Sequence, residues 1–416
     1  MNLSKYQKII LLIIYFILCI TTNIFYRKSL YDLSLSFQRS FQEKFNSQII
    51  KLYFKIITHF GSQVFYIPVF IILFFFNPLN YFIYILSTLL IAIYFSNILK
   101  IIYHNPRPFW NDKKLFKDVC EGGFGNPSGH ALGSISTYLG ISHLLIKNKL
   151  FKENIKFQIG LFVFTIFFIL NIMLSRIYIG VHSIDQIIYG GLLGLGFYYL
   201  MFFIIKGYEF KPKEFLNKIY EGKLIMICVF LILLFFPLPF YFFSKSQYTD
   251  YNKYDQIFNE FCPKVKFYLK YFNNDLVGCL LILILLGMYL GLIFLKEKID
   301  IDFPDCENKI INLNKTNTTI RLKRSMIFLV FSFPILLTLI IPETNLFVIF
   351  VFKIGLSFFL TGFSIFGPGI YYGFVFSQKD ENNSPKVEYN YNEITEINNN
   401  TIASPPEKLL LINIEC

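Results

Sequence analysis

Long runs of apolar residues that contain no charged side chain alternate with shorter polar segments along most of this chain. A helix needs about 20 apolar residues to cross a bilayer core. Every backbone amide in lipid must be hydrogen-bonded within its own segment, so such runs predict transmembrane helices. The predicted spans are 9–26, two within 56–99 divided at Asn77-Pro78, 131–146, 157–174, 187–205, 224–243, 276–295, 326–341 and one or two within 346–376. The expected fold is therefore an all-α, polytopic transmembrane helical bundle of about ten spans.

The same pattern divides the chain into four parts. Residues 1–54 are expected to hold an N-terminal signal-anchor span and a connecting segment. Residues 55–205 form a core that carries the polar motifs described below, and residues 206–376 add further transmembrane helices. Residues 377–416 are polar and Asn-rich, which is typical of a disordered tail.

Basic residues give the expected orientation in the membrane. With strictly alternating spans, segments 147–156, 206–223 and 296–324 fall on one side and are denser in Lys and Arg than the connecting segments on the other side. Because cytosolic loops carry an excess of Lys and Arg, the denser side is expected to be cytosolic. The segment 100–130 then lies on the non-cytosolic side.

Composition supports a membrane protein. Of the 416 residues, 55% are hydrophobic and only 16% are charged, which excludes a disordered chain and an ordinary soluble enzyme. The net charge of +12 comes from basic residues that lie mostly between apolar blocks, where they meet lipid head groups rather than nucleic acid. The seven cysteines form no pair with zinc-site spacing, so no metal site is expected. A bridge between Cys120 and Cys262, both on the non-cytosolic side, is a hypothesis.

Three polar clusters lie at the ends of predicted spans. The first runs from Lys100 to Arg107-Pro108, and the second is Pro-Ser-Gly-His at 127–130. The third begins at Ser175-Arg176 and continues through His182 to Asp185-Gln186. Alternation of the spans places all three clusters at the same, non-cytosolic membrane face.

These residue types suit the binding and transfer of a phosphoryl group. Lys100, Arg107 and Arg176 are three cations that match phosphate oxygens. Ser128 and Gly129 precede a predicted helix, where backbone N–H groups and the helix dipole attract an anion. Two imidazoles, His130 and His182, could act as nucleophile and as proton donor. The three cations could neutralise transition-state charge in place of a metal.

Each cluster also has a structural interpretation when it is taken alone. Lys100 and Arg107 could extend from a helix end to the membrane surface, 127–129 could be a turn with a helix cap, and His182 could be a packing residue. Arg176 directly follows an apolar span, where a charge is costly. The joint arrangement at one face favours a functional site.

The three clusters resemble the signature of the membrane branch of the phosphatidic acid phosphatase type 2/haloperoxidase superfamily: Lys-x6-Arg-Pro, Pro-Ser-Gly-His and Ser-Arg-x5-His-x3-Asp. The resemblance covers about residues 55–205, which would then be a phosphatase core with its site at the lumenal or outer membrane face. It implies that His182 is the nucleophile, which forms a phosphohistidine, and that His130 is the general acid. The residues implied to bind phosphate are Lys100, Arg107, Ser128, Gly129 and Arg176.

One position departs from this signature. The final Asp of the family pattern would be residue 186, but this chain has Gln186, with Asp185 one residue earlier. That acid normally orients the nucleophilic His through its second ring nitrogen. Residues i+3 and i+4 on a helix both face residue i, so either Asp185 or Gln186 could reach His182. Gln at this place, and Cys120-Glu121-Gly122 ahead of the second cluster, resemble the glucose-6-phosphatase branch.

The sequence thus predicts a metal-independent and cofactor-independent phosphomonoesterase in an internal membrane, the endoplasmic reticulum, with a lumenal active site. We expect a lipid phosphate, such as a sphingoid-base phosphate or phosphatidate, in preference to a sugar phosphate, because apolar spans surround the site. The extra spans resemble both the glucose-6-phosphatase and the sphingosine-phosphate phosphatase branches. The alternatives are a glucose-6-phosphatase-like sugar phosphatase, a polyprenyl diphosphatase, and a non-catalytic membrane protein that binds or scrambles phospholipid. Membrane lipids and the phosphate ester are the expected partners, and nucleic acid is not.

Overall fold

The computed structural model describes the chain with gaps. The longer described ranges are 4–62, 79–115, 120–147, 154–206, 212–250, 270–302 and 348–372, and the shorter pieces are 65–66, 69–70, 253–256, 260, 262, 326, 330–331, 334 and 345–346. Within these residues every regular element is a helix and none is a strand, which confirms the all-α prediction. The predicted tail at 377–416 and most of the predicted span at 326–341 lie outside the described residues.

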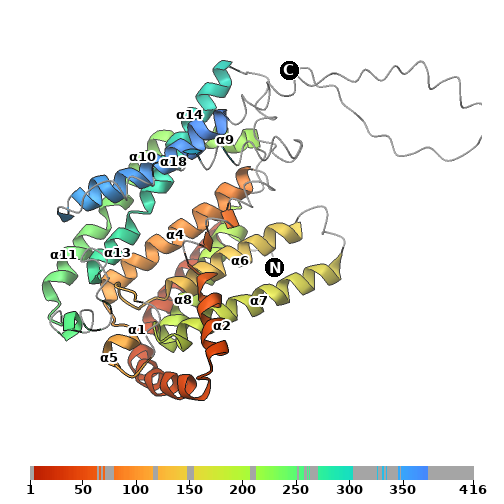
Figure 1. Ribbon diagram of the computed structural model, residues 1–416. Coiled ribbons are helices and arrows are strands. Elements are labelled where there is room, and N and C mark those ends of the chain that lie inside the picture. The colour runs from red at the N-terminus through yellow and green to blue at the C-terminus, as the bar shows by residue number, and fades with distance from the viewer. Residues whose placement is uncertain are drawn as a thin grey trace, which may run out of the picture.

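The first half of the chain forms one group of helices (Figure 1). Helix α6 lies at its centre and packs against α4, α7 and α8, while α1 packs on α8 and α2 packs on α7. The N-terminal helix starts at a capping box, in which Ser4 and Gln7 satisfy each other's backbone N–H groups. The elements of this group are α1 (Lys5–Lys44), α2 (Gln48–His59), α4 (Leu79–Tyr103), α5 (Pro108–Asn111), α6 (Gly129–Lys147), α7 (Ile155–Tyr178), α8 (Ile184–Tyr199) and η1 (Leu200–Ile205).

The second half of the chain adds another group of helices beside the first (Figure 1). Helix α14 contacts α9, α10, α18 and η7, and α13 joins the two groups because it packs along α4. The elements here are α9 (Pro212–Glu221), α10 (Lys223–Phe235), α11 (Pro237–Gln247), α13 (Tyr271–Cys279), α14 (Ile282–Asp302), η6 (Val348–Leu356), α18 (Ser357–Ser364) and η7 (Ile365–Gly369).

Seven helical stretches in the described residues are long and apolar enough to cross a bilayer. They are Lys5–Lys44, Tyr81–Asn111, Ile155–Tyr178, Ile184–Ile205, Lys223–Gln247, Tyr271–Asp300 and Val348–Tyr372. The protein is an integral membrane protein, but the predicted count of about ten spans is not confirmed. The predicted span at 131–146 is a helix, α6, although it is not among the seven. Its several Gly, Ser and Thr residues lower its hydropathy, and they are buried against neighbouring helices.

Helix α1 is longer than the predicted span at 9–26, because it continues without a break to Lys44. Its second half carries polar side chains that are buried: Gln38 donates to the backbone oxygen of His182, and Gln42 donates to that of Tyr178. The extension of α1 therefore supports the turn between α7 and α8.

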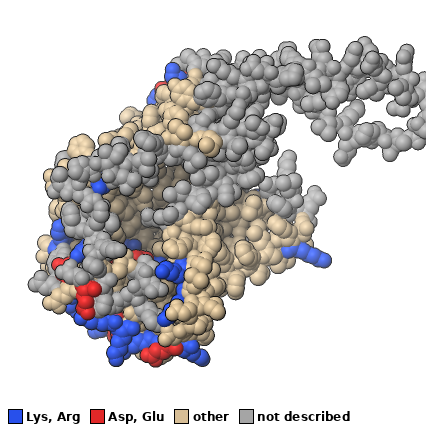
Figure 2. All heavy atoms as spheres, in the orientation of Figure 1, with Lys and Arg blue, Asp and Glu red and all other residues tan. Residues whose placement is uncertain are grey.

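On the face shown in Figure 2, charged side chains gather at the lower end of the molecule, the end at which Figure 1 places α5.

Candidate active site

A cavity of about 650 Å³ lies where α4 ends, α6 begins and the α7–α8 turn passes. Helix α13 from the second group supplies one wall. Polar and charged side chains contribute to its lining, although transmembrane helices surround it. The residues that line it are Gly61, Tyr66, Ile93, Ser96, Asn97, Lys100, Arg107, Cys120, Glu121, Gly122, Gly129, His130, His182, Asn274, Val277 and Gly278.

All three sequence clusters meet at this cavity because each lies at a helix end on the same side of the bundle. Lys100 is in the last turn of α4, and Arg107 is the N-cap residue of α5. His130 is the second residue of α6, and Arg176 is in the last turn of α7. His182 lies in the short turn that leads into α8. Helices that alternate in direction thus bring residues far apart in sequence to one place.

The imidazole of His182 is almost fully buried and is held at both nitrogens. Its Nδ1 lies 3.2 Å from Gln186 Oε1, and its Nε2 lies 3.1 Å from Arg107 Nη1. A guanidinium can only donate, so Nε2 must be the accepting nitrogen, and Nδ1–H donates to the amide oxygen. This arrangement fixes the tautomer that has a lone pair on Nε2.

Gln186, and not Asp185, makes the hydrogen bond to His182. The Gln186 amide group donates from Nε2 to the backbone oxygen of Pro106 at 3.0 Å, which turns Oε1 toward His182. Oε1 also accepts the backbone N–H of Ser183 in the capping box that starts α8. The sequence left open whether Asp185 or Gln186 contacts His182. In the structure Gln186 makes this contact, because its side chain folds back at the start of α8.

Arg107 is 2% exposed and contacts several groups of the site. Its Nε donates to Gly123 O at 2.6 Å, and its Nη1 donates to Val181 O at 3.1 Å. Nη1 also lies 2.7 Å from Glu121 Oε2. Backbone carbonyls from two segments thus fix the guanidinium beside the His182 ring, with the charge directed into the cavity.

Arg176 is linked to Arg107 by the carboxylate of Glu121, which pairs with both arginines. Its Nη1 donates to Thr58 Oγ1 at 2.6 Å, and its Nη2 pairs with Glu121 Oε1. The Glu121 carboxylate therefore bridges the two arginines, Arg107 and Arg176. Arg176 Nε has no hydrogen-bond partner among the described residues, although it is buried. The site thus holds an unused guanidinium donor next to a bridging carboxylate.

The third cation, Lys100, is paired with an acidic residue from the second group of helices. Its Nζ lies 4.0 Å from Asp275 Oδ1 on α13. Asp275 is fully buried, and its Oδ2 accepts the backbone N–H of Phe124 at 3.0 Å. Asp275 therefore contacts both the lysine and the segment whose carbonyls hold Arg107. A Cβ at Gly123 would lie 2.4 Å from Asp275 Oδ1, so only glycine permits this approach.

The second cluster forms the start of α6. Gly129 and His130 line the cavity, and a Cβ at Gly129 would lie 3.9 Å from Lys100 Nζ. Ser128 is fully buried, and its backbone N–H donates to Gln186 O at 3.0 Å. Its Oγ is 3.5 Å from the N–H of Ala131, which makes Ser128 a helix cap. Ser128 is not among the residues that line the cavity, whereas His130 faces the same space as His182.

Burial and neighbouring charges set the ionisation of His182 and Glu121. Burial, and then the charges of Arg107 and Arg176, hold the pKa of His182 well below the usual value of 6.5, so the ring is neutral at physiological pH. Burial alone would raise the pKa of Glu121, but Arg107 and Arg176 hold it well below its usual range. The site therefore combines a neutral imidazole, a carboxylate and three cations.

The contacts of two acidic residues at the site were not predicted from the sequence. Glu121 was noted only for its likeness to one branch of the family, and its bridge between arginines depends on tertiary structure. Asp275 stands directly before a predicted span, and a charge at such a place is a signal of function. Among the described residues, no group of three or more His, Cys, Asp or Glu side chains is arranged to hold a metal ion.

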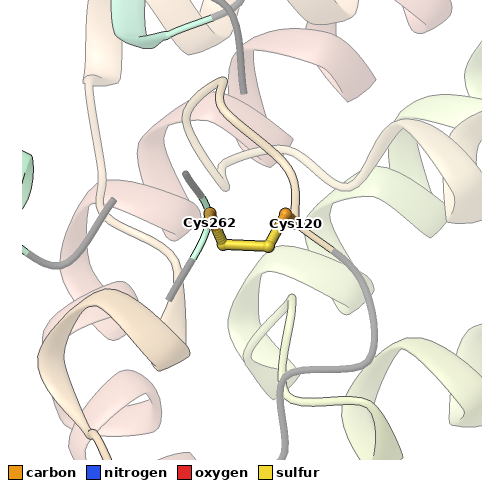
Figure 3. Close-up of a disulfide and its surroundings, with 2 residues drawn as sticks. All are labelled: Cys120 and Cys262. Carbon is orange, nitrogen blue, oxygen red and sulfur yellow. A yellow bond between two sulfur atoms is a disulfide. The ribbon is translucent and has the colours of Figure 1, made fainter. Parts of the chain in front are cut away.

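The hypothesised bridge between Cys120 and Cys262 is present as a disulfide (Figure 3). It joins the residue before Glu121 to a segment that precedes α13. The backbone N–H of Tyr271 also donates to Gly122 O at 2.7 Å. The segment that carries Glu121 is therefore attached to the second helical group on both sides.

Comparison with known proteins agrees with the motifs. Residues 81–209 match the model of a family described as the PAP2 superfamily, so the resemblance is confirmed over this range. Phosphatidylglycerophosphatase B of Bacillus subtilis (strain 168) is 34% identical over 100 residues, which cover 24% of this chain and 46% of that protein. Glucose-6-phosphatase catalytic subunit 1 of Mus musculus is 30% identical over 176 residues, which cover 38% of this chain and 46% of that protein.

A solved structure was also found. The crystal structure of the first transmembrane PAP2 type phosphatidylglycerolphosphate phosphatase from Bacillus subtilis has a TM-score of 0.39 and 21% sequence identity, over 49% of this chain and 96% of that chain. The chain spans less than half of the length of the two curated relatives.

Proposed function

We propose that the PAP2 superfamily region at residues 81–209 makes this chain a metal-independent phosphomonoesterase of the membrane, in which His182 forms a phosphohistidine. The lone pair of His182 Nε2 attacks phosphorus as the bond from phosphorus to the ester oxygen breaks. Burial, and then the charge of Arg176, hold the pKa of His130 well below its usual value, and the negative charge of a bound phosphate raises it, so that His130 carries the proton that it gives to the leaving oxygen. Water then attacks phosphorus and loses a proton to His130, and the P–N bond breaks to release inorganic phosphate and free His182.

The observation that carries this proposal is the state of His182. Gln186 Oε1 accepts a hydrogen bond from Nδ1–H, so the lone pair is on Nε2, where it faces Arg107 Nη1. A low pKa keeps the ring neutral, and a neutral imidazole is the form that can attack phosphorus. His182 thus has the orientation and ionisation that a nucleophile requires.

The cations supply the electrostatic part of the reaction. Arg107, Arg176 and Lys100 are buried, and in a site shielded from water fixed positive charges stabilise developing negative charge strongly. The start of α6 adds backbone N–H groups and the helix dipole. These groups would hold the phosphate while His182 attacks, which is the role proposed for Lys100, Arg107, Ser128, Gly129 and Arg176.

For the substrate we propose a lipid monophosphate that is hydrolysed on the lumenal face of the endoplasmic reticulum. The integral membrane fold and the name of the Bacillus subtilis relative, a phosphatidylglycerophosphatase, favour a lipid. A disulfide at the site favours an oxidising compartment such as the lumen. A sugar phosphate is the second candidate, because polar and charged side chains line part of the cavity and the mouse relative is named as a glucose-6-phosphatase.

The test uses the full chain purified in detergent with EDTA present. We expect release of inorganic phosphate from lipid monophosphates, and a covalent phosphohistidine that is labile in acid when the reaction is quenched early. His182→Ala should abolish both the release and the trapped intermediate. His130→Ala should slow the release, while its intermediate accumulates because the water is no longer deprotonated.

Two results would refute the proposal. One is activity that requires an added metal ion, and the other is near-normal turnover by His182→Ala. If the purified chain releases no phosphate but moves labelled phospholipid between the leaflets of vesicles, the non-catalytic alternative is correct.

A further inference from the structure

The anion site between the two arginines is already occupied by a side chain of the protein. Glu121 Oε2 lies 2.7 Å from Arg107 Nη1, and Oε1 pairs with Arg176 Nη2. The carboxylate is ionised, since its pKa lies well below its usual range. Glu121 therefore fills, in this structure, positions that phosphate oxygens need.

A phosphate that His182 can attack must take over at least one of these contacts. Arg107 Nη1 lies 3.1 Å from His182 Nε2, so the same nitrogen that pairs with Glu121 borders the position of the reacting phosphorus. Phosphate and carboxylate would otherwise meet as like charges in a buried place, which is unfavourable. Substrate binding thus requires the carboxylate to turn away from Arg107.

The carboxylate cannot go far, because the backbone on both sides is fixed. Cys120 is bridged to Cys262, and Gly122 O accepts the N–H of Tyr271 at 2.7 Å. Only the side chain of Glu121 can rotate, so its charge stays within the cavity beside the leaving group. A buried carboxylate that loses an arginine needs new hydrogen-bond donors.

Two buried hydroxyl groups of the cavity also favour a substrate with a polar leaving group. Ser96 is 1% exposed and Tyr66 is 3% exposed, and both line the cavity. Their hydroxyl groups have no hydrogen-bond partner among the described residues. Buried hydroxyl groups are normally paired, so a ligand with its own polar groups would complete them.

We propose that Glu121 is the specificity-determining residue of this site, which leaves the anion position when phosphate binds and accepts hydrogen bonds from donors on the leaving alcohol. The substrate is then a monophosphate whose alcohol carries a hydroxyl or ammonium group close to the ester oxygen. A lipid with such a head group and a free polyol phosphate share this chemistry. This inference rests on the proposed phosphatase function.

The experiment measures kcat/KM of the purified full chain for two matched pairs of substrates. Glycerol 3-phosphate and propyl phosphate differ by the hydroxyl groups of the alcohol. Lysophosphatidate and phosphatidate differ at the second glycerol carbon, which has a free hydroxyl only in the first. We expect the donor-bearing member of a pair to be preferred by about tenfold or more, because hydrogen bonds to charged acceptors are strong. The pair with the higher kcat/KM identifies the source, lipid or free polyol.

Glu121→Gln then separates the two parts of the proposal. The neutral amide is a weaker acceptor and a weaker competitor for the arginines. The preference within a pair should therefore fall to less than about threefold, while inhibition by inorganic phosphate should strengthen by about tenfold. Glu121→Asp restores the charge and should recover part of the preference. Glu260→Gln, at an exposed ion pair with Lys113, is the matched control and should change neither quantity.

The possible failures are distinguishable. If no substrate of any kind yields phosphate, the proposed function is wrong. If phosphate is released without a preference for the donor-bearing members, or if Glu121→Gln weakens inhibition by phosphate, the function stands and the role of Glu121 is overturned. A substitution that merely damaged the fold would lower all rates together and would not move preference and inhibition in these opposite senses.

Discussion

Gln186→Ala tests the central hydrogen bond of the site. The substitution removes the acceptor of the His182 Nδ1–H, at 3.2 Å, and the donor to Pro106 O, at 3.0 Å. It also removes the acceptor of the Ser183 N–H at the start of α8. Three buried polar groups lose their partner in one step, and the imidazole loses the contact that selects its tautomer.

The magnitude follows from these contacts. One hydrogen bond that orients the proposed nucleophile, His182, is worth about 1–1.5 kcal/mol, so kcat/KM should fall by about tenfold. An unsatisfied buried group costs about 1–3 kcal/mol, and the free energy of unfolding should therefore fall by several kcal/mol. A larger loss in stability than in transition-state stabilisation is expected, because only one of the three contacts touches the reacting ring.

The assay compares phosphate release per folded molecule for Gln186→Ala and for Asp185→Asn, with folding checked by thermal unfolding. Asp185 is the neighbouring residue on α8 and makes no hydrogen bond to His182, so its amide variant should retain kcat/KM within about twofold. If Asp185→Asn loses more activity than Gln186→Ala, or if Gln186→Ala is silent, the assignment of Gln186 as the partner of His182 is wrong.

Three further predictions concern ionisation and charge. Because the low pKa of His182 keeps the reactive neutral form at acidic pH, the acid limb of kcat/KM should lie below pH 6.5, the usual value for imidazole; a pH–rate profile with a midpoint above that value would contradict this. Arg107→Lys should lower kcat/KM by about 100-fold, because one ammonium cannot replace charge-assisted bonds worth about 1.5–3 kcal/mol each, and steady-state kinetics of the folded variant would measure the loss. Asp275→Ala should lower the free energy of unfolding by about 3 kcal/mol in a denaturation assay, since it leaves Lys100 buried without its counter-charge, and unchanged stability would rule out the pairing.

The sequence was sufficient to predict where the site lies. The clusters at Lys100–Arg107, 127–130 and Arg176–His182 stand at span ends that alternation brings to one face, and that placement depends only on hydropathy and direction. The start of α8 carries a further signal in the sequence, its capping box of Ser183 and Gln186. A Ser at the N-cap followed by Gln at the third position predicts that the Gln side chain folds back toward the helix start.

Other features depend on contacts that hydropathy does not encode. Asp275 and Lys100 are further apart in sequence than the whole length of the matched region 81–209, and no local pattern pairs them. The bridge of Glu121 between two arginines depends on the conformation of the loop that carries Glu121. A periodic pattern of hydrophobic residues does not encode it. The predicted span count is not confirmed in the described part, where a helix such as α6, which is buried among neighbours, carries many small polar residues.

The disulfide of Cys120 with Cys262 has a consequence for how the protein matures. Its two halves are separated by 142 residues, so the segment that carries Glu121 is secured only after the ribosome has passed the second cysteine and an oxidant has acted. A truncated product that ends at residue 209 would contain every signature residue and yet lack both this tether and Asp275. Heterologous production should therefore keep the whole chain and supply oxidising conditions, or the recovered polypeptide will hold an incomplete candidate site.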